Sequence, residues 1–279
     1  MSESFSPDWL ALREPYDAMA VDHGLLKALT AWALARPDGL QVVDLGAGTG
    51  ANLRRLAPLL GPGQRWTLVE VDTALVAAGE AFPPVGDVEV RYRRLDLARD
   101  LDRVGEDGPV DLLTASALLD LVSEDWSRRL AALRSRLGCA LYASLTYDGR
   151  VAWSPEDPAD SAAHAAVDRH QRTDKGFGPA LGPTAVGTLG RLLGTAGGGR
   201  SRTAASDWRL GVDDTEIQRE LLRGYASAAE AVEPRRADVF RAWRHRRQEQ
   251  LLAGASELLV GHRDLLFLPA TPAQPSSTA

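Results

Sequence analysis

Short apolar runs alternate with amphipathic stretches between about residue 40 and residue 148. The stretches repeat apolar residues every three or four positions, as helices with one buried face do, whereas the runs have the length of buried strands. Five such runs occur, at residues 40–46, 65–72, 88–97, 110–116 and 139–147. Strands that alternate with helices form crossover units, so the pattern predicts an α/β fold with a parallel sheet covered by helices on both faces.

The flanking parts of the chain are more helical. Apolar residues at helical spacing predict a helical segment within residues 8–36. After residue 148 the pattern predicts, in order, a helix at 158–172, a helix near 184–195, a weak strand at 200–206, two helices across 213–253 and a long final strand at 257–270. Residues 1–7 and 271–279 are rich in Ser, Pro and Ala, and we expect them to be disordered.

Composition and charge narrow the possible partners. The chain has 279 residues, of which 44% are hydrophobic and 25% charged, as is ordinary for soluble globular proteins. Its net charge of −6 argues against nucleic acid as the main partner, because phosphate binding needs a basic face. The single cysteine, Cys139, excludes an internal disulfide framework. No apolar run approaches a membrane span and the N-terminus lacks a signal-peptide pattern, so we expect a cytoplasmic protein with no membrane partner.

The sequence VVDLGAGTGAN at residues 42–52 places Gly46, Gly48 and Gly50 two positions apart, directly after a predicted strand. Glycine tolerates positive φ, and its missing Cβ lets a ligand approach the backbone. Such a loop could hold a dinucleotide pyrophosphate, hold the amino-acid end of S-adenosylmethionine, or simply turn a strand into a helix. Gly46, Gly48 and Ala51 satisfy the relaxed dinucleotide pattern, so the loop alone leaves these readings open.

Acidic residues at the ends of the next strands separate the readings. Asp44 lies inside the apolar strand before the loop, where a carboxylate would repel a pyrophosphate but hold an ammonium group. Glu70 ends the second strand, where it can accept hydrogen bonds from the hydroxyls of a ribose. Asp96, followed by Leu97, could accept from an adenine amino group and cover its ring, although Asp96 could equally cap the helix that follows.

Taken together, Asp44, the three glycines, Glu70 and Asp96 resemble the successive cofactor motifs of class I S-adenosylmethionine-dependent methyltransferases, over roughly residues 40–146. The resemblance implies a Rossmann-like, doubly wound sheet of seven strands whose last strand runs antiparallel. It implies S-adenosyl-L-methionine as the cofactor. The cofactor residues that it implies are Asp44, Gly46, Ala47, Gly48, Thr49, Gly50, Asn52, Glu70, Val71, Asp96, Leu97, Ser116 and Ala117.

The same resemblance divides the chain into five parts. We expect an N-terminal helical segment (1–36), a cofactor-binding core (37–148), helical insertions with one sheet strand that form a partial lid over substrate (149–257), the final strand (258–270) and the tail (271–279). The segment TASALLDL lacks the Asn/Asp-Pro-Pro-aromatic signature of methyltransferases that act on nucleic-acid amines. The resemblance therefore favours a small-molecule acceptor, with secondary metabolites among the options.

Candidate catalytic and substrate residues gather in the segment HQRTDKGFGPALGP. His170 and Asp174 are four positions apart and would share a helix face, which could orient the imidazole as a general base. Lys175 could bind a substrate carboxylate or phosphate, and Gln171 and Phe177 could contact the substrate. A plain helix C-terminus would explain the same residues. Two more candidates follow strands: Tyr147 as an acid or a substrate contact, and Asp120 as a substrate contact.

The predicted function is in-line methyl transfer from S-adenosylmethionine to a small molecule. Three alternatives stay open: another bond cleavage at the sulfonium, as in a cyclase or lyase, a nicotinamide-dependent oxidoreductase, and a protein that binds the cofactor without turnover. No histidine and carboxylate spacing suggests a metal site. The arginine-rich run at 235–248 predicts a helix covered with ion pairs rather than a nucleic-acid surface. Both a monomer and a homodimer are compatible with the sequence.

Overall fold

The computed structural model describes residues 5–36 and 38–270, and its centre is a twisted sheet in the order β3-β2-β1-β4-β5-β8-β6. Strands β1 to β5 run parallel to one another, and β8 is antiparallel to both β5 and β6. The expected seven-stranded sheet with an antiparallel last strand is confirmed. The strands of this order are β1 (Gln41–Leu45), β2 (Arg65–Val69), β3 (Glu89–Arg93), β4 (Leu112–Ser116), β5 (Ala140–Ser154), β6 (Gly199–Ala205) and β8 (Glu257–Pro269).

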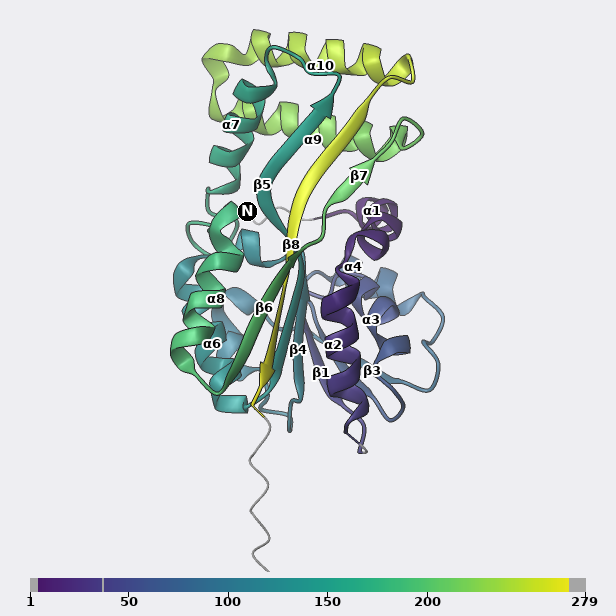
Figure 1. The fold of residues 1–279 in the computed structure, drawn as a ribbon, viewed down its shortest axis with the longest axis vertical. Coiled ribbons are helices and arrows are strands. Elements are labelled where there is room, and N and C mark those ends of the chain that lie inside the picture. Colours follow the sequence, from purple (N-terminus) through teal and green to yellow (C-terminus); the bar gives the residue numbers. More distant parts are fainter. Residues whose placement is uncertain (1–4, 37, 271–279) are drawn as a thin grey trace, which may run out of the picture.

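Helices cover both faces of this sheet (Figure 1). The helices are α1 (Pro7–Ala20), α2 (His23–Leu34), α3 (Ala51–Leu56), α4 (Thr73–Glu80), α5 (Leu97–Asp100), α6 (Glu124–Leu137), α7 (Asp160–Gln171), α8 (Ala185–Ala196), α9 (Thr215–Val232) and α10 (Ala237–Leu252). Single 3-10 turns lie at Ala57–Leu59, Leu101–Arg103, Leu119–Leu121, Gly182–Thr184 and Pro234–Arg236. Helices α6 and α8 bury leucines against one face, and α2 and α3 do so against the other.

A third apolar core lies beyond the carboxyl ends of the parallel strands. There the paired strands β5 and β8 extend beyond the other strands of the sheet and pack against α7, α9 and α10 (Figure 1). Trp153, Trp208, Phe240 and Trp243 are buried in this core. An eighth strand, β7 (Trp208–Leu210), pairs with β8 here and was not expected from the sequence, since three residues are too short to show a strand pattern.

Arginines of helix α10 form ion pairs that attach it to the start of α7 and the segment before it. Arg246 forms an ion pair with Asp157 at 2.6 Å, and the fully buried Arg247 pairs with Asp160 at the start of α7. The ion-paired helix expected from the sequence is therefore what the structure contains. Among the described residues, no helix has both the length and the apolar character that crossing a membrane would require.

Strand β5 runs to Ser154, past the expected core boundary at residue 148. Beyond Tyr147 most of its side chains are exposed or half-buried, so the apolar pattern that marks a strand is weak there. The division of the chain into five parts stays a prediction.

The buried carboxylate of Asp264 joins three parts of the chain. One oxygen accepts hydrogen bonds from the backbone N–H of Asp22 and the hydroxyl of Tyr142, both at 3.0 Å. The other accepts the N–H of Leu145 at 2.9 Å, where the backbone has a φ of 56°. Asp264 thereby fixes the start of α2 and the irregular turn of β5 against β8.

We expect Asp264→Ala to lower the free energy of unfolding by about 3 kcal/mol or more, because it leaves two buried donors and one partly buried donor without an acceptor. Urea unfolding monitored by circular dichroism measures this loss. The exposed Asp213→Ala is the matched control and should change stability by less than about 0.5 kcal/mol. Equal effects of the two substitutions would contradict this role of Asp264.

Candidate functional site

The carboxyl ends of β1, β2 and β4 border a cavity of about 680 Å³, called the first cavity below. Helix α1 and the loop that contains Lys175 and Phe177 complete its walls. Of the predicted cofactor residues, all but Gly50 line it: Asp44, Gly46, Ala47, Gly48, Thr49, Asn52, Glu70, Val71, Asp96, Leu97, Ser116 and Ala117. Gly50 instead forms the N-cap of α3. The structure thus brings together residues that are more than 70 positions apart in the sequence.

The glycine loop after β1 needs glycine for two reasons. Gly46, Gly48 and Gly50 have φ values of 67°, 55° and 81°, which other residues rarely adopt. A Cβ on Gly48 would also lie 3.0 Å from a methyl carbon of Leu10 in α1. The loop is therefore a tight turn that exposes its backbone to the first cavity while α1 packs closely over it.

Asp44 is a buried carboxyl group of the first cavity whose pKa is strongly shifted. Its side chain is only 1% exposed, and Oδ1 accepts a hydrogen bond from Asn52 Nδ2 at 3.0 Å. Oδ2 has no hydrogen-bond partner within the described part of the chain. Burial raises the pKa of Asp44 to about 7, although Asn52 and Arg55 oppose the rise. A carboxylate held in this way gains most from a cationic partner.

A polar network behind Asp44 fixes its orientation. Asn52 Nδ2 also donates to Thr114 Oγ1 at 2.7 Å, and Asn52 Oδ1 accepts from Arg55 Nη2 at 2.5 Å. Arg55 Nη2 donates further to Ser144 Oγ at 2.8 Å. Side chains from β1, α3, β4 and β5 are thus tied together beneath the first cavity, and Asp44 cannot turn away from it without breaking this network.

Glu70 closes the glycine loop from the next strand. Its Oε2 accepts the N–H of Gly48 at 2.9 Å, and its Oε1 accepts the N–H groups of Val71 and Asp72 at 2.7 and 2.9 Å. A carboxylate has about four acceptor positions, so a further hydrogen bond from a ligand hydroxyl is compatible with these three. Glu70 therefore stabilises the conformation of the glycine loop whether or not it also contacts a ligand.

Asp96 and Ala117, which follow β3 and β4, also line the first cavity. Asp96 caps α5 by accepting the N–H of Ala98 at 3.0 Å and lines the cavity as well, so the cap leaves its predicted role toward adenine open. Ala117, after β4, has a φ of 51°, and its N–H donates to Ser144 O at 3.0 Å. Left-handed backbone at a residue other than glycine is costly and is concentrated at functional sites.

Sequence reasoning missed the contribution of α1. Leu10, Arg13 and Asp17 line the first cavity, and Glu14 forms a two-pronged ion pair with Arg54 of α3 at 2.6 and 2.7 Å. The only signal in the sequence was the spacing of Arg13 and Asp17, which form an ion pair one helical turn apart at 2.9 Å. Such pairs are common on helices, so this spacing did not mark a site.

The predicted pairing of His170 with Asp174 is wrong. Helix α7 ends at Gln171, so the two residues do not share a helix face. Asp174 Oδ1 instead accepts the N–H groups of Gly176 and Gly178, at 2.7 and 2.9 Å. The Nδ1 atom of His170 lies 3.2 Å from Lys175 Nζ. Because an ammonium group has only donors, Nδ1 accepts the hydrogen bond in this contact, and the role of His170 as a general base stays a prediction.

The other residues predicted to contact substrate lie in different places: some line the first cavity, some line a second cavity and some line neither. Lys175 and Phe177 line the first cavity, whereas His170 and Gln171 line a second cavity next to it. Tyr147 donates to Asp168 Oδ1 at 3.1 Å, and burial raises its pKa well above the usual range. The buried Asp120, whose pKa burial raises to about 6, and Tyr147 line neither cavity. Their roles in substrate binding or catalysis stay predictions.

No cluster of three or more His, Cys, Asp or Glu side chains that could hold a metal ion occurs in residues 5–36 and 38–270. The groups that line the first cavity are carboxylates, the cationic side chains of Arg13, Arg99 and Lys175, backbone N–H groups and a few hydroxyls.

Comparison of the sequence with family models finds no match, and no curated protein matches it either. Solved structures are similar at low identity. The cyclopropane synthase MmaA2 from Mycobacterium tuberculosis has 12% identity and a TM-score of 0.50, over 95% of each chain. The mycolic acid cyclopropane synthase CmaA1, complexed with SAH and CTAB, has 12% identity and a TM-score of 0.51, over 94% of each chain. A SAM-dependent methyltransferase from Geobacter sulfurreducens has 15% identity and a TM-score of 0.45, over 95% of this chain and 99% of that one.

Likenesses at this identity show the fold alone. The TM-scores of 0.50 and 0.51, over 94% or more of each chain, show that this chain shares the fold of the two cyclopropane synthases. The chain therefore has the Rossmann-like fold of the class I S-adenosylmethionine-dependent methyltransferases, as the sequence resemblance implied.

The raised pKa of Asp44 predicts how the stability of the folded chain depends on pH. The pKa of Asp44 rises from the ordinary 3.8 to about 7 on folding. Below about pH 4 the group is protonated in both the folded and the unfolded chain. As the pH rises from 4 to 7 the unfolded chain ionises first, so the folded chain loses stability over this range. Asp44→Asn cannot ionise and escapes this loss. Between pH 5.5 and pH 8 the free energy of unfolding of Asp44→Asn, relative to the unsubstituted protein, should rise by about 2 kcal/mol. Urea titrations at both pH values measure it; a difference that does not change with pH would contradict the raised pKa.

Proposed function

We propose that the chain is an S-adenosylmethionine-dependent methyltransferase that acts on a small-molecule acceptor. The observation that carries the proposal is the unpartnered Oδ2 of Asp44, buried beside the glycine loop and facing the first cavity. A zwitterionic nucleoside would place an ammonium group against this carboxylate, whereas a dinucleotide would place a pyrophosphate near it. The charge of the site therefore favours S-adenosylmethionine over a nicotinamide cofactor.

The residues of the first cavity fit the parts of that cofactor. Asp44 and the loop from Gly46 to Gly50 would hold the methionine moiety, and Glu70 would accept from the ribose hydroxyls. Asp96 and Leu97 would hold the adenine, which leaves Ser116 and Ala117 near the sulfonium. The volume of about 680 Å³ lies within the range of small-ligand pockets. When bound, the cofactor supplies an electrophilic methyl group.

The contribution of the chain would then be positioning. Methyl transfer by in-line displacement depends on holding donor and acceptor close and aligned, which rigid walls achieve. The glycine loop is fixed by Glu70 on one side and by α1 on the other, through Leu10 and the ion pair of Glu14 with Arg54. Cover by α1 and the loop at Lys175 and Phe177 would limit the access of water to the first cavity. A cytoplasmic location, and a monomeric or homodimeric state, belong to the same proposal.

Binding of S-adenosylhomocysteine, measured by calorimetry, tests the cofactor assignment. Asp44→Asn should weaken the affinity by roughly 10- to 150-fold, the equivalent of about 1.5–3 kcal/mol for a charge-assisted hydrogen bond. In the unsubstituted protein the affinity should rise between pH 5.5 and pH 7.5, because an ammonium group binds the ionised form of Asp44 and the pKa of this group without ligand is about 7.

The exposed Asp87→Asn is the matched control and should leave both the affinity and its pH dependence unchanged. Tight binding of NAD with no affinity for S-adenosylhomocysteine would overturn the proposal.

Analysis of the products separates methyl transfer from other cleavage at the sulfonium. With a methyl acceptor, S-adenosylhomocysteine should accumulate in a one-to-one ratio with methylated product, since the sulfur keeps its other two substituents. Liquid chromatography with mass spectrometry measures both. Methylthioadenosine as the sole product would instead support a cyclase or lyase on the same fold.

A further inference from the structure

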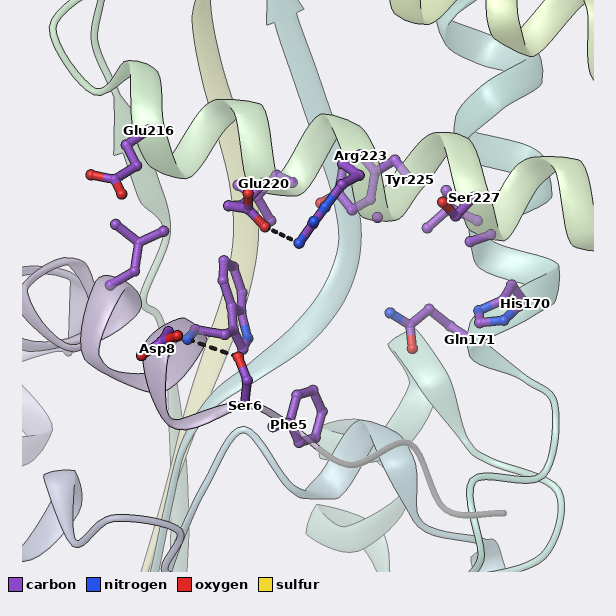
Figure 2. A pocket seen from close by; sticks show the side chains of 16 residues that line it. Phe5, Ser6, Asp8, His170, Gln171, Glu216, Glu220, Arg223, Tyr225 and Ser227 are labelled. Carbon is purple, nitrogen blue, oxygen red and sulfur yellow. Dashed lines mark hydrogen bonds and ion pairs between the residues drawn. The ribbon is translucent and has the colours of Figure 1, made fainter. Parts of the chain in front are cut away.

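The second cavity has a volume of about 760 Å³ and lies between the start of α1, the end of α7 and the length of α9. Figure 2 shows Phe5 and Asp8 on one side of this space, Glu216, Glu220, Arg223 and Tyr225 along α9, and His170 with Gln171 at the end of α7. Its apolar lining comes from Leu12, Val167 and Leu221. Nothing in the proposed cofactor site accounts for this space.

The first and second cavities share two walls. Asp8, Trp9 and Leu12 of α1 line the second cavity, and Leu10, Arg13 and Asp17 line the first. At 100° per residue these two sets lie on neighbouring faces of one helix, roughly a third of a turn apart.

The second shared wall is the end of α7 with the loop that follows it. His170 lines the second cavity and Lys175 the first, and the contact of 3.2 Å between them joins the two sides of this wall. Phe5 lines both cavities. A compartment that adjoins the donor site in this way is placed to hold the acceptor.

The charges of the second cavity point to the chemistry of its ligand. Three carboxylates line it, those of Asp8, Glu216 and Glu220, against one guanidinium, that of Arg223. Arg223 forms an ion pair with Glu220, whereas Asp8 and Glu216 form none with any other described residue.

Aromatic rings accompany these carboxylates. Phe5, Trp9 and Tyr225 line the same space. Carboxylates together with the faces of aromatic rings recognise an organic cation, the first through charge and the second through the ring quadrupole. A carboxylate or phosphate ligand would be repelled by Asp8 and Glu216.

We propose that the second cavity binds the methyl acceptor, and that this acceptor is a small apolar molecule carrying a cationic amine. The inference rests on the proposed methyltransferase function and names the substrate class that this function leaves open. The ammonium group lies toward Asp8 and Glu216, and the apolar body extends along Leu12, Val167 and Leu221 toward the wall shared with the first cavity.

Three probes of one shape and different charge test this inference: phenethylamine, 2-phenylethanol and phenylacetate. Their affinities are measured by ligand-observed NMR on the full chain in the presence of S-adenosylhomocysteine, whose own affinity is measured in the same samples. We expect phenethylamine to bind at least tenfold more tightly than either isostere. Glu216→Gln should weaken phenethylamine binding about fivefold to tenfold and leave the affinity for S-adenosylhomocysteine unchanged.

Glu230→Gln is the matched control, since Glu230 lies on the same helix but outside the second cavity and pairs with Arg241. It should change neither affinity. Equal binding of the three probes, preference for phenylacetate, absence of phenethylamine binding, or an equal effect of both glutamine substitutions would overturn the inference while S-adenosylhomocysteine still binds. Failure of S-adenosylhomocysteine to bind would instead overturn the proposed function, and amine binding would then identify a cation site alone.

Discussion

The site depends on one buried carboxylate that is only half satisfied. Asp44 lies in the central strand β1 with one oxygen bound to Asn52 and the other facing the first cavity without a partner. Such a group destabilises the folded chain, so its place is explained by what it can bind rather than by what it holds together. Asn52, Arg55 and the serines of β4 and β5 keep it pointed at the cavity.

The rest of the fold supplies the walls around that group. The glycine loop and Glu70 form the floor, because three glycines allow the turn and Glu70 accepts the N–H of Gly48. The apolar core beyond the sheet positions another wall: β5 and β8 extend far enough for α7 and α9 to pack there, and the loop that follows α7, with Lys175 and Phe177, lines the first cavity. Asp264 links this extension to the start of α2.

Much of the sheet and of the first cavity could be predicted from the sequence. Parallel strands are buried on both faces, so they appear as apolar runs, and their carboxyl ends meet at one edge, so Asp44, Glu70 and Asp96 could be placed together. The secondary structure beyond residue 148 was harder to predict from the sequence. Strand β7 has three residues, and His170 and Asp174 have helical spacing although α7 ends between them. The part of α1 in the site depends on tertiary contacts, such as that of Glu14 with Arg54, which leave no periodic signal.

Helix α1 contributes side chains to both cavities from two of its faces, and this has a thermodynamic consequence. A ligand in one compartment that shifts or steadies the helix also changes the shape or the freedom of the other. Because coupling free energies are reciprocal, each occupant would then alter the affinity for the other by the same factor. Cooperativity between two small molecules can thus arise within a single subunit, with one helix as the mechanical link.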